Sequence, residues 1–177
     1  MSAGPTASAD LAALLAQRCG GSASGGAGDL TVDVPADRWV QALTVARDDL
    51  GLNFFDWLSA VDDVDAGLSV VCHLAAVRPE PAGAGGRLGG HLLVRTVVSQ
   101  RSPALATATS VFAGASWHER ETWEMFGIDF TGHPNLVPLL LPDGFVGQPL
   151  RKGFQLQARV QRPWPGDKTS AAGQVPR

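Results

Sequence analysis

The sequence predicts an α+β fold: an antiparallel β-meander covered by helices, followed by an extended, proline-rich C-terminal ribbon and a basic tail. Three observations support this prediction. Three strand-like segments follow one another with no helical pattern between them. Apolar residues recur at helical spacing both before and after these segments. Finally, residues 128–154 contain four prolines, which exclude a long helix there.

Residues 1–29 are expected to form an N-terminal helix and a flexible loop. Ser8 can cap a short helix that carries Leu11, Leu14 and Leu15 on one side. The stretch 20–28 is rich in Gly, Ser and Ala, a composition typical of a flexible connection. We therefore place the start of the main domain at residue 30.

The α+β domain is expected to span residues 30–127. After a first strand, Pro35 opens a helix that Gly51 ends. The meander follows, with apolar side chains alternating along its strands and a Pro- and Gly-rich hairpin loop between the last two. One or two helices must cover the apolar face of the sheet that the meander forms. The expected strands are 30–34, 53–61, 68–77 and 91–99, with a turn over 62–67 and the hairpin loop over 78–90.

Two helical segments are expected after the meander. The first starts at Ser102 and breaks near Gly114, and the second covers 115–126 and ends at Gly127. The ribbon 128–154 is apolar but too rich in proline to build a core. We therefore expect it to lie on the domain or on a partner.

Charge is unevenly distributed along the chain. The net charge is −3, but from Arg151 onward there are six basic residues against one acidic residue, a net +5, which leaves −8 for the body. This asymmetry predicts that the tail, residues 155–177, docks on an acidic surface and is flexible unless bound. A nucleic-acid partner is not expected, because the acidic body would repel phosphate.

Cofactor and metal sites are not expected in this chain. Cys19 and Cys72 are far apart, whereas an iron–sulfur cluster usually needs about four thiolates, so both are expected to be buried small apolar residues. The pair His118-Glu119 lacks the second histidine of a zinc protease, since position 122 is Thr. No apolar run approaches the roughly 20 residues of a membrane span, and no signal peptide is visible. A cytoplasmic chain is therefore expected.

The helix 115–126 carries an unusual acidic residue. At 100° per residue, Glu119 falls in the middle of an apolar face, where an ionised carboxylate needs a partner. We expect Arg120 or Arg151 to supply it. Arg120 and Glu124, four residues apart, are expected to pair with each other on the flank. This pattern indicates a charge network that ties the helix to its neighbours, rather than a catalytic base.

The same helix begins a long motif that continues through the ribbon. It comprises Trp117, Glu119, Arg120, Glu121, Trp123, Glu124, Phe126, Gly127, Gly132, His133, Pro134, Pro149, Leu150, Arg151 and Lys152. Together these residues resemble the signature of the C-type subunits of respiratory complex I (NADH-quinone oxidoreductase, 30 kDa subunit type). Departures from the family pattern occur at Trp123, Glu124, Val137-Pro138, Gln148 and Gly153, which indicates a divergent version of the complex.

The resemblance implies a non-redox structural subunit in the hydrophilic arm of a proton-translocating NADH:quinone oxidoreductase. It implies a peripheral location on the cytoplasmic side of the membrane, with membrane association only through partners. The expected partners are chiefly the D-type subunit, at the quinone site, and also the B- and I-type subunits. The signature residues are then structural or partner contacts, the isolated chain is inactive, and FMN and iron–sulfur clusters belong to partner subunits.

Two alternatives remain. The chain could be the equivalent scaffold subunit of a membrane-bound hydrogenase or of a dehydrogenase with another electron donor, because other subunits determine the donor. It could also be a free-standing small enzyme that uses Glu119 or His133. Co-purifying partners distinguish the first alternative, and activity of the isolated chain would support the second.

Overall fold

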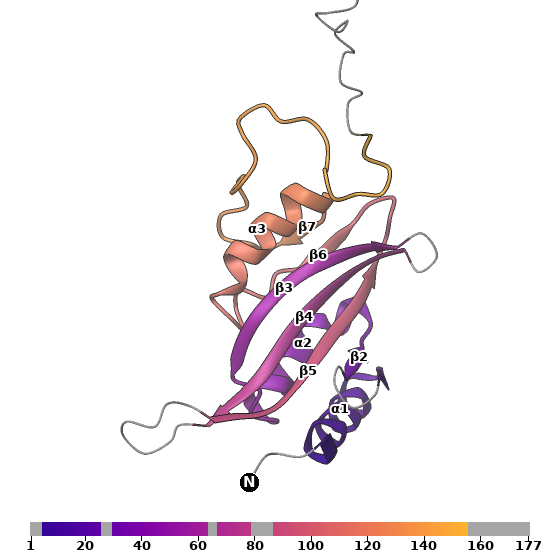
Figure 1. Ribbon diagram of the computed structural model, residues 1–177, viewed down its shortest axis with the longest axis vertical. Helices are drawn as coiled ribbons and strands as arrows, with labels where there is room; N and C mark the ends of the chain where they lie inside the picture. Colours follow the sequence, from indigo (N-terminus) through magenta and orange to yellow (C-terminus); the bar gives the residue numbers. More distant parts are fainter. Residues whose placement is uncertain (1–4, 26–29, 64–66, 79–86, 156–177) are drawn as a thin grey trace, which may run out of the picture.

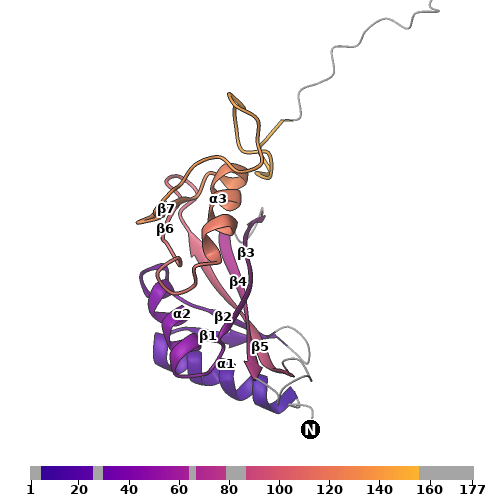
Figure 2. The same cartoon turned by 90° about the vertical axis from the view of Figure 1, so that its left-hand side faces the viewer.

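The computed structural model describes residues 5–25, 30–63, 67–78 and 87–155, which form an elongated molecule (Figures 1 and 2). Helices α1 (Pro5–Cys19) and α2 (Trp39–Asp48) lie at one end, and α3 (Ala115–Phe126) lies toward the other, next to the ribbon. The predicted α+β class is confirmed.

A five-stranded sheet with the order β1-β2-β5-β4-β3 forms the centre of the described structure. Its long strands β3, β4 and β5 pair antiparallel in sequence order, as the predicted meander requires. Each differs from its expected bounds by up to four residues, and β3 continues into the expected turn. The strands are β1 (Ser22–Ser24), β2 (Thr31–Asp33), β3 (Phe54–Asp63), β4 (Gly67–Arg78) and β5 (Arg87–Val98). Residues 64–66 of the turn and 79–86 of the hairpin loop lie outside the described residues.

The sheet is mixed rather than purely antiparallel, because β2 runs parallel to β5. In addition, β1 forms within the stretch predicted to be a loop and pairs antiparallel with β2. Glycine permits this pairing: a Cβ on Gly21 would lie 2.2 Å from the carbonyl oxygen of Asp33. The prediction of a flexible loop over 20–28 is thus wrong for Ser22–Ser24, and residues 26–29 lie outside the described part.

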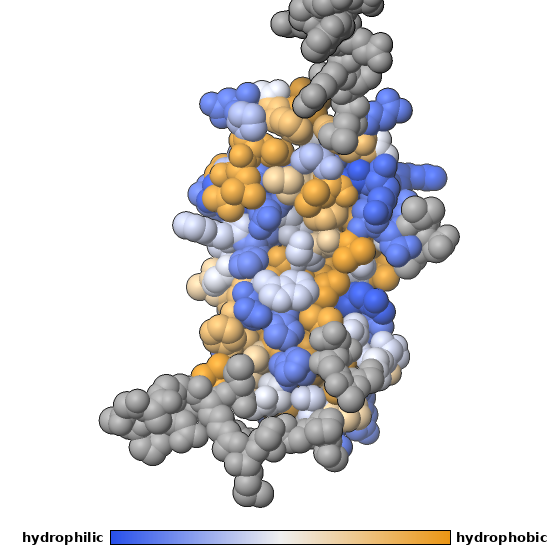
Figure 3. Space-filling model, in the orientation of Figure 1, coloured by the Kyte–Doolittle hydropathy of each residue, from blue (hydrophilic) through white to orange (hydrophobic). Residues whose placement is uncertain are grey.

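The helices cover one face of the sheet. α1 packs on β5 and α2, with Leu15 fully buried, whereas Leu14 is 42% exposed, contrary to the predicted face. Ser8 lies inside α1 instead of capping it. A 3₁₀ turn, η1 (Ala36–Arg38), leads from Pro35 into α2, whose Trp39 is fully buried. In Figure 1, α2 lies behind the sheet. The opposite face of the sheet, which Figure 3 shows in the same orientation, is not covered by a described helix, and we call it the open face.

The segment between the meander and α3 is not a helix, contrary to prediction. It contains β6 (Ala104–Ala106), which pairs parallel with β7 (Asp129–Thr131) at the start of the ribbon. Both strands alternate exposed, buried and exposed residues, so that Leu105 and Phe130 enter the core. This pairing satisfies backbone groups on both segments, which local helical spacing does not reveal.

Candidate functional site

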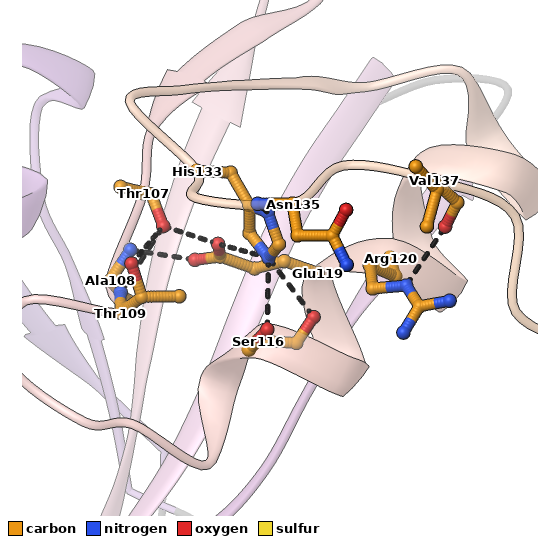
Figure 4. A network of polar contacts seen from close by, with 9 residues as sticks. All are labelled: Thr107, Ala108, Thr109, Ser116, Glu119, Arg120, His133, Asn135 and Val137. Carbon is orange, nitrogen blue, oxygen red and sulfur yellow. Dashed lines mark hydrogen bonds and ion pairs between the residues drawn. The ribbon is translucent and has the colours of Figure 1, made fainter.

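The polar residues of the motif gather where α3 meets the turn after β6 and the ribbon after β7 (Figure 4). α3 itself packs against β3. It ends as predicted at Gly127, whose φ of 72° is the left-handed conformation that glycine adopts readily. Gly127 is also crowded, because an added Cβ would lie 3.0 Å from Cγ of Gln148. Both constraints bring the ribbon close to the end of α3.

Glu119 is fully buried on the apolar face of α3, as predicted. Its carboxylate accepts hydrogen bonds from the backbone N–H of Ala108, at 2.6 Å, and from the hydroxyl of Thr107. The prediction that Arg120 or Arg151 is its partner is wrong. Burial raises the pKa of Glu119 above its ordinary value, and the bonds from Thr107 and Ala108 oppose that shift. Donors from the turn after β6, rather than the expected arginine, therefore hold this carboxylate.

His133 completes this network from the ribbon side. Its Nε2 lies 3.1 Å from the carbonyl oxygen of Ser116 and 3.9 Å from the Glu119 carboxylate. Its Nδ1 accepts the backbone N–H of Asn135 at 3.0 Å, so the ring proton is on Nε2. Both side chains are fully buried. His133 thus joins the start of the ribbon to the first turn of α3, and neither it nor Glu119 is open to a substrate.

Glu124 binds the middle of the ribbon through backbone donors. Its carboxylate accepts the N–H groups of Leu139, Leu140 and Leu141 at 2.9, 2.7 and 3.3 Å. Only 7% of Glu124 is exposed. Such an arrangement satisfies three backbone donors that lie outside any helix or sheet. One acidic side chain thereby fixes the shape of this part of the ribbon.

Arg120 binds the same part of the ribbon through carbonyl oxygens. Its guanidinium donates to Val137 at 2.8 Å and to Pro138 at 2.6 Å. The predicted ion pair between Arg120 and Glu124 is therefore wrong. Arg120 instead donates to carbonyl oxygens of the ribbon, and Glu124 accepts its N–H groups. The rule that pairs opposite charges four residues apart was derived for isolated helices and does not include such backbone partners.

The far end of the ribbon returns to the domain at two points. The N–H of Leu150 donates to the carbonyl oxygen of Met125 near the end of α3, at 3.1 Å. The N–H of Lys152 donates to the carboxylate of Asp62 in β3 at 2.9 Å, and the guanidinium of Arg151 lies 3.9 Å from the same group. The ribbon is therefore a closed loop anchored at both ends.

The remaining motif residues divide between the interior and the surface. Phe126 is buried, and Trp123 and Pro149 are half-buried. The others are exposed, and no side chain among them joins these bonds: Trp117, Glu121, Gly132, Pro134, Leu150 and Lys152. Leu150 is 52% exposed and Trp117 69%. The motif thus combines an internal network with an exposed apolar surface.

Several residues of the network were not predicted, because they are distant in sequence. Thr107, Ala108 and Asp62 carry no local pattern that links them to α3. His118, considered only as a metal ligand, has its Nδ1 3.4 Å from the backbone nitrogen of Leu58 and 3.2 Å from its carbonyl oxygen. It therefore covers part of the outer edge of β3, the last strand of the sheet.

Metal-ligating side chains, the two thiols and one cavity complete the description of the site. Within the described residues, no group of three or more His, Cys, Asp or Glu side chains is arranged to hold a metal ion. Cys19 and Cys72 are buried, as expected, and burial raises the pKa of both thiols. A cavity of about 380 Å³ lies between α3 and the ribbon, with Trp123, Glu124 and Phe145 among its lining residues. In the described parts of the chain, no helix is long and apolar enough to cross a membrane.

Fold and site together define an α+β domain that presents an extended C-terminal ribbon on its last helix. The profile of the family "Respiratory-chain NADH dehydrogenase, 30 Kd subunit" matches residues 32–160. The chain belongs to this family, and its resemblance to the C-type subunits of complex I is confirmed.

Named relatives agree with this assignment. The C subunit of NADH-quinone oxidoreductase from Citrifermentans bemidjiense is 36% identical over 141 residues, which are 78% of this chain and 82% of that protein. The C subunit from Roseiflexus castenholzii is 37% identical over 158 residues, covering 87% and 85%. A longer relative, the C/D subunit from Yersinia pestis, is 36% identical over 100 residues, which are 56% of this chain but 15% of that one.

Solved structures share the fold. The trypsin-resistant fragment (1–134) of Nqo5 superposes with a TM-score of 0.60 at 27% identity, over 72% of this chain and 98% of the fragment. A chain of the membrane-bound sulfane sulfur reductase, an archaeal respiratory membrane complex, gives a TM-score of 0.68 at 20% identity, over 90% and 96%. The second likeness concerns the fold alone.

Proposed function

We propose that this chain is a non-redox structural subunit of the hydrophilic arm of a proton-translocating NADH:quinone oxidoreductase. It braces the D-type subunit at the quinone site and contacts the B- and I-type subunits while electrons pass from NADH to quinone. FMN and iron–sulfur clusters reside in partner subunits, and the isolated chain is inactive. It is peripheral, on the cytoplasmic side of the membrane, and reaches the membrane only through its partners.

The observation that carries this proposal is that the ribbon is held by the domain and yet exposes large apolar residues. Glu124 and Arg120 of α3 bind its backbone, and its own His133 contacts the carbonyl oxygen of Ser116 in α3. The exposed apolar residues of the ribbon are Val137 at 41%, Leu140 at 60%, Phe145 at 42%, Val146 at 87% and Leu150 at 52%. We call these five residues the ribbon face. Clustered exposed apolar residues are typical of protein–protein interfaces.

A rigid ribbon also favours tight association. Ordering a flexible segment during binding opposes association by about 0.5–1.5 kcal/mol per immobilised side chain. The network of α3 fixes the ribbon beforehand, so that more of the apolar contact contributes to affinity. The combined name of the Yersinia relative, which joins the letters C and D, supports the D-type subunit as the partner that receives this face.

A related scaffold role is the second candidate. The shared fold with a chain of the archaeal sulfane sulfur reductase supports an equivalent subunit in a membrane-bound hydrogenase or in a dehydrogenase with another donor. The free-standing enzyme is not favoured, because Glu119 and His133 are buried and bonded.

Recovery of the tagged chain from solubilised membranes, with identification of its partners by mass spectrometry, tests the proposal. The D-, B- and I-type subunits are the expected partners, together with the NADH-oxidising subunits. Recovery with hydrogenase subunits would favour the second candidate. A chain recovered without any respiratory subunit would contradict both.

A further inference from the structure

Three polar side chains from neighbouring strands meet on the open face of the sheet, away from the ribbon. Nδ1 of His73 in β4 lies 2.9 Å from a carboxylate oxygen of Asp56 in β3. Nε2 of the same ring lies 3.2 Å from Nδ1 of His91 in β5. The indole of Trp57 stacks on His73, with centroids 5.9 Å apart and planes at 22°. A hollow of about 360 Å³ adjoins them, lined by Phe54, Asp56, His73, Ala75 and His91.

Two β-bulges are associated with this cluster. The register shifts between Phe55 and Trp57 in β3, and between Ala75 and Val77 in β4. In a regular strand, the neighbours Asp56 and Trp57 would point to opposite faces. The bulge in β3 accounts for both reaching His73. Bulges often re-aim side chains next to functional sites.

The protons of the cluster leave one ring nitrogen as an acceptor. The Asp56 carboxylate accepts the Nδ1–H of His73, which leaves a lone pair on Nε2. Nδ1–H of His91 then donates to that lone pair. If the ring proton of His91 moves from Nδ1 to Nε2, then Nε2 of His73 and Nδ1 of His91 both carry a lone pair, and neither ring loses a proton overall.

The spacing of these nitrogens suits a metal ion. Two bonds of about 2.05 Å, the usual zinc–imidazole length, span 3.2 Å when they meet at an angle of about 100°. That angle lies between octahedral and tetrahedral values. Asp56 would orient His73 by accepting the hydrogen bond from its Nδ1, while Nε2 of His73 binds the metal. The exposed ring of His91 and the adjoining hollow leave room for small ring rotations.

We propose that His73 and His91 bind a borderline transition-metal dication such as Zn²⁺, with water or a partner side chain filling the remaining positions. The protein supplies two ligands, fewer than the three or four of catalytic and structural zinc sites, so the ion exchanges readily. Imidazole nitrogen selects zinc, copper or nickel over Mg²⁺, which prefers oxygen. When bound, the ion joins β4 to β5 near their hairpin end.

Calorimetric titration of the full chain, washed free of metal by a chelator, tests the site with ZnCl₂ and, separately, MgCl₂. We expect saturable binding of one Zn²⁺ and none of Mg²⁺. His91→Gln should lower the affinity at least 10-fold, and Asp56→Ala about 10-fold, as for other residues that orient a metal ligand. His118→Gln, which changes a histidine outside the cluster, serves as the matched control and should bind like the wild type.

Equal Zn²⁺ affinity of His91→Gln and the wild type would overturn the proposal, as would the absence of saturable binding. NMR spectra during the titration provide a second readout. The ring signals of His73 and His91 should shift before those of His118. The reverse order would also contradict the site. The measurement needs no partner subunit, so its outcome is independent of the proposed scaffold role.

Discussion

Replacement of Glu124 by Gln tests how the ribbon is held. The wild-type carboxylate accepts three backbone N–H groups, those of Leu139, Leu140 and Leu141. Gln has the same shape but only one acceptor oxygen, so its NH₂ group faces at least one of these donors. The variant therefore leaves at least one ribbon N–H without its acceptor and removes the charge that strengthens the other bonds.

The expected magnitude follows from these contacts. A hydrogen bond to a charged group contributes about 1.5–3 kcal/mol. The ribbon can open while the sheet remains folded. The lost hydrogen-bond energy should therefore appear as easier local opening of the ribbon and not as global unfolding. At about 1.4 kcal/mol per factor of ten, local opening becomes about 10- to 100-fold more frequent.

Amide hydrogen exchange of the Leu139–Leu141 segment, followed by mass spectrometry or NMR, measures this opening directly. Glu121→Gln is the matched control, because Glu121 is exposed on the same helix and accepts no ribbon bond in the described structure. Its exchange should match the wild type. Unchanged exchange in Glu124→Gln, or an equal increase in the control, would refute the account of the ribbon.

Three further predictions concern the core acid, the tail and the cofactors. Glu119→Ala leaves the Ala108 N–H without its acceptor and the Thr107 hydroxyl with only its Thr109 partners, and chemical denaturation should show a loss of about 1–3 kcal/mol. Because the pKa of Glu119 is raised in the folded state, its contribution to stability is complete below about pH 4.5 and declines as the pH rises through the folded pKa. Glu119→Gln should lack this decline, and parallel pH profiles of the two proteins would contradict it. Deletion of the chain after Phe154 should leave a folded domain whose binding to the D-type subunit is weaker and less salt-dependent, because exposed charges are screened within about 8–10 Å; identical salt series would show that the tail plays no part. The chain purified and dialysed without a chelator should be colourless, with no bound flavin and no tightly held iron or zinc, and a visible absorbance band or one tightly held metal per chain would contradict this.

Elements with strong local patterns were predicted well. The helix 115–126 matches α3, and the alternation of apolar residues located the long strands of the meander. The segment between Ser102 and Gly114 was predicted wrongly as a helix. Its Leu105 enters the core as part of a three-residue strand, β6, which forms only beside β7. Such a strand depends on a segment that follows α3, and no local spacing encodes it.

The site shows the same division. That Glu119 is buried follows from helical spacing alone. Its partners do not, because Thr107 and Ala108 belong to an irregular turn and His133 to the ribbon. The pairing rule for residues four apart on a helix also failed for Arg120, where unpaired carbonyl oxygens of the ribbon compete for the guanidinium.

The binding affinity of ribbon-face variants for the isolated D-type subunit tests the central claim most directly. Burial of each large apolar side chain contributes about 1.5–3 kcal/mol, so Leu140→Asp and Val146→Asp should each weaken binding at least 10-fold while circular dichroism stays unchanged. Leu14→Asp is the control, because Leu14 is exposed and belongs to α1, the helix that lies at the end of the molecule opposite the ribbon (Figure 1). The account predicts wild-type affinity for this control. Equal affinities of all three variants and the wild type would show that the ribbon face is not the surface that binds the D-type subunit.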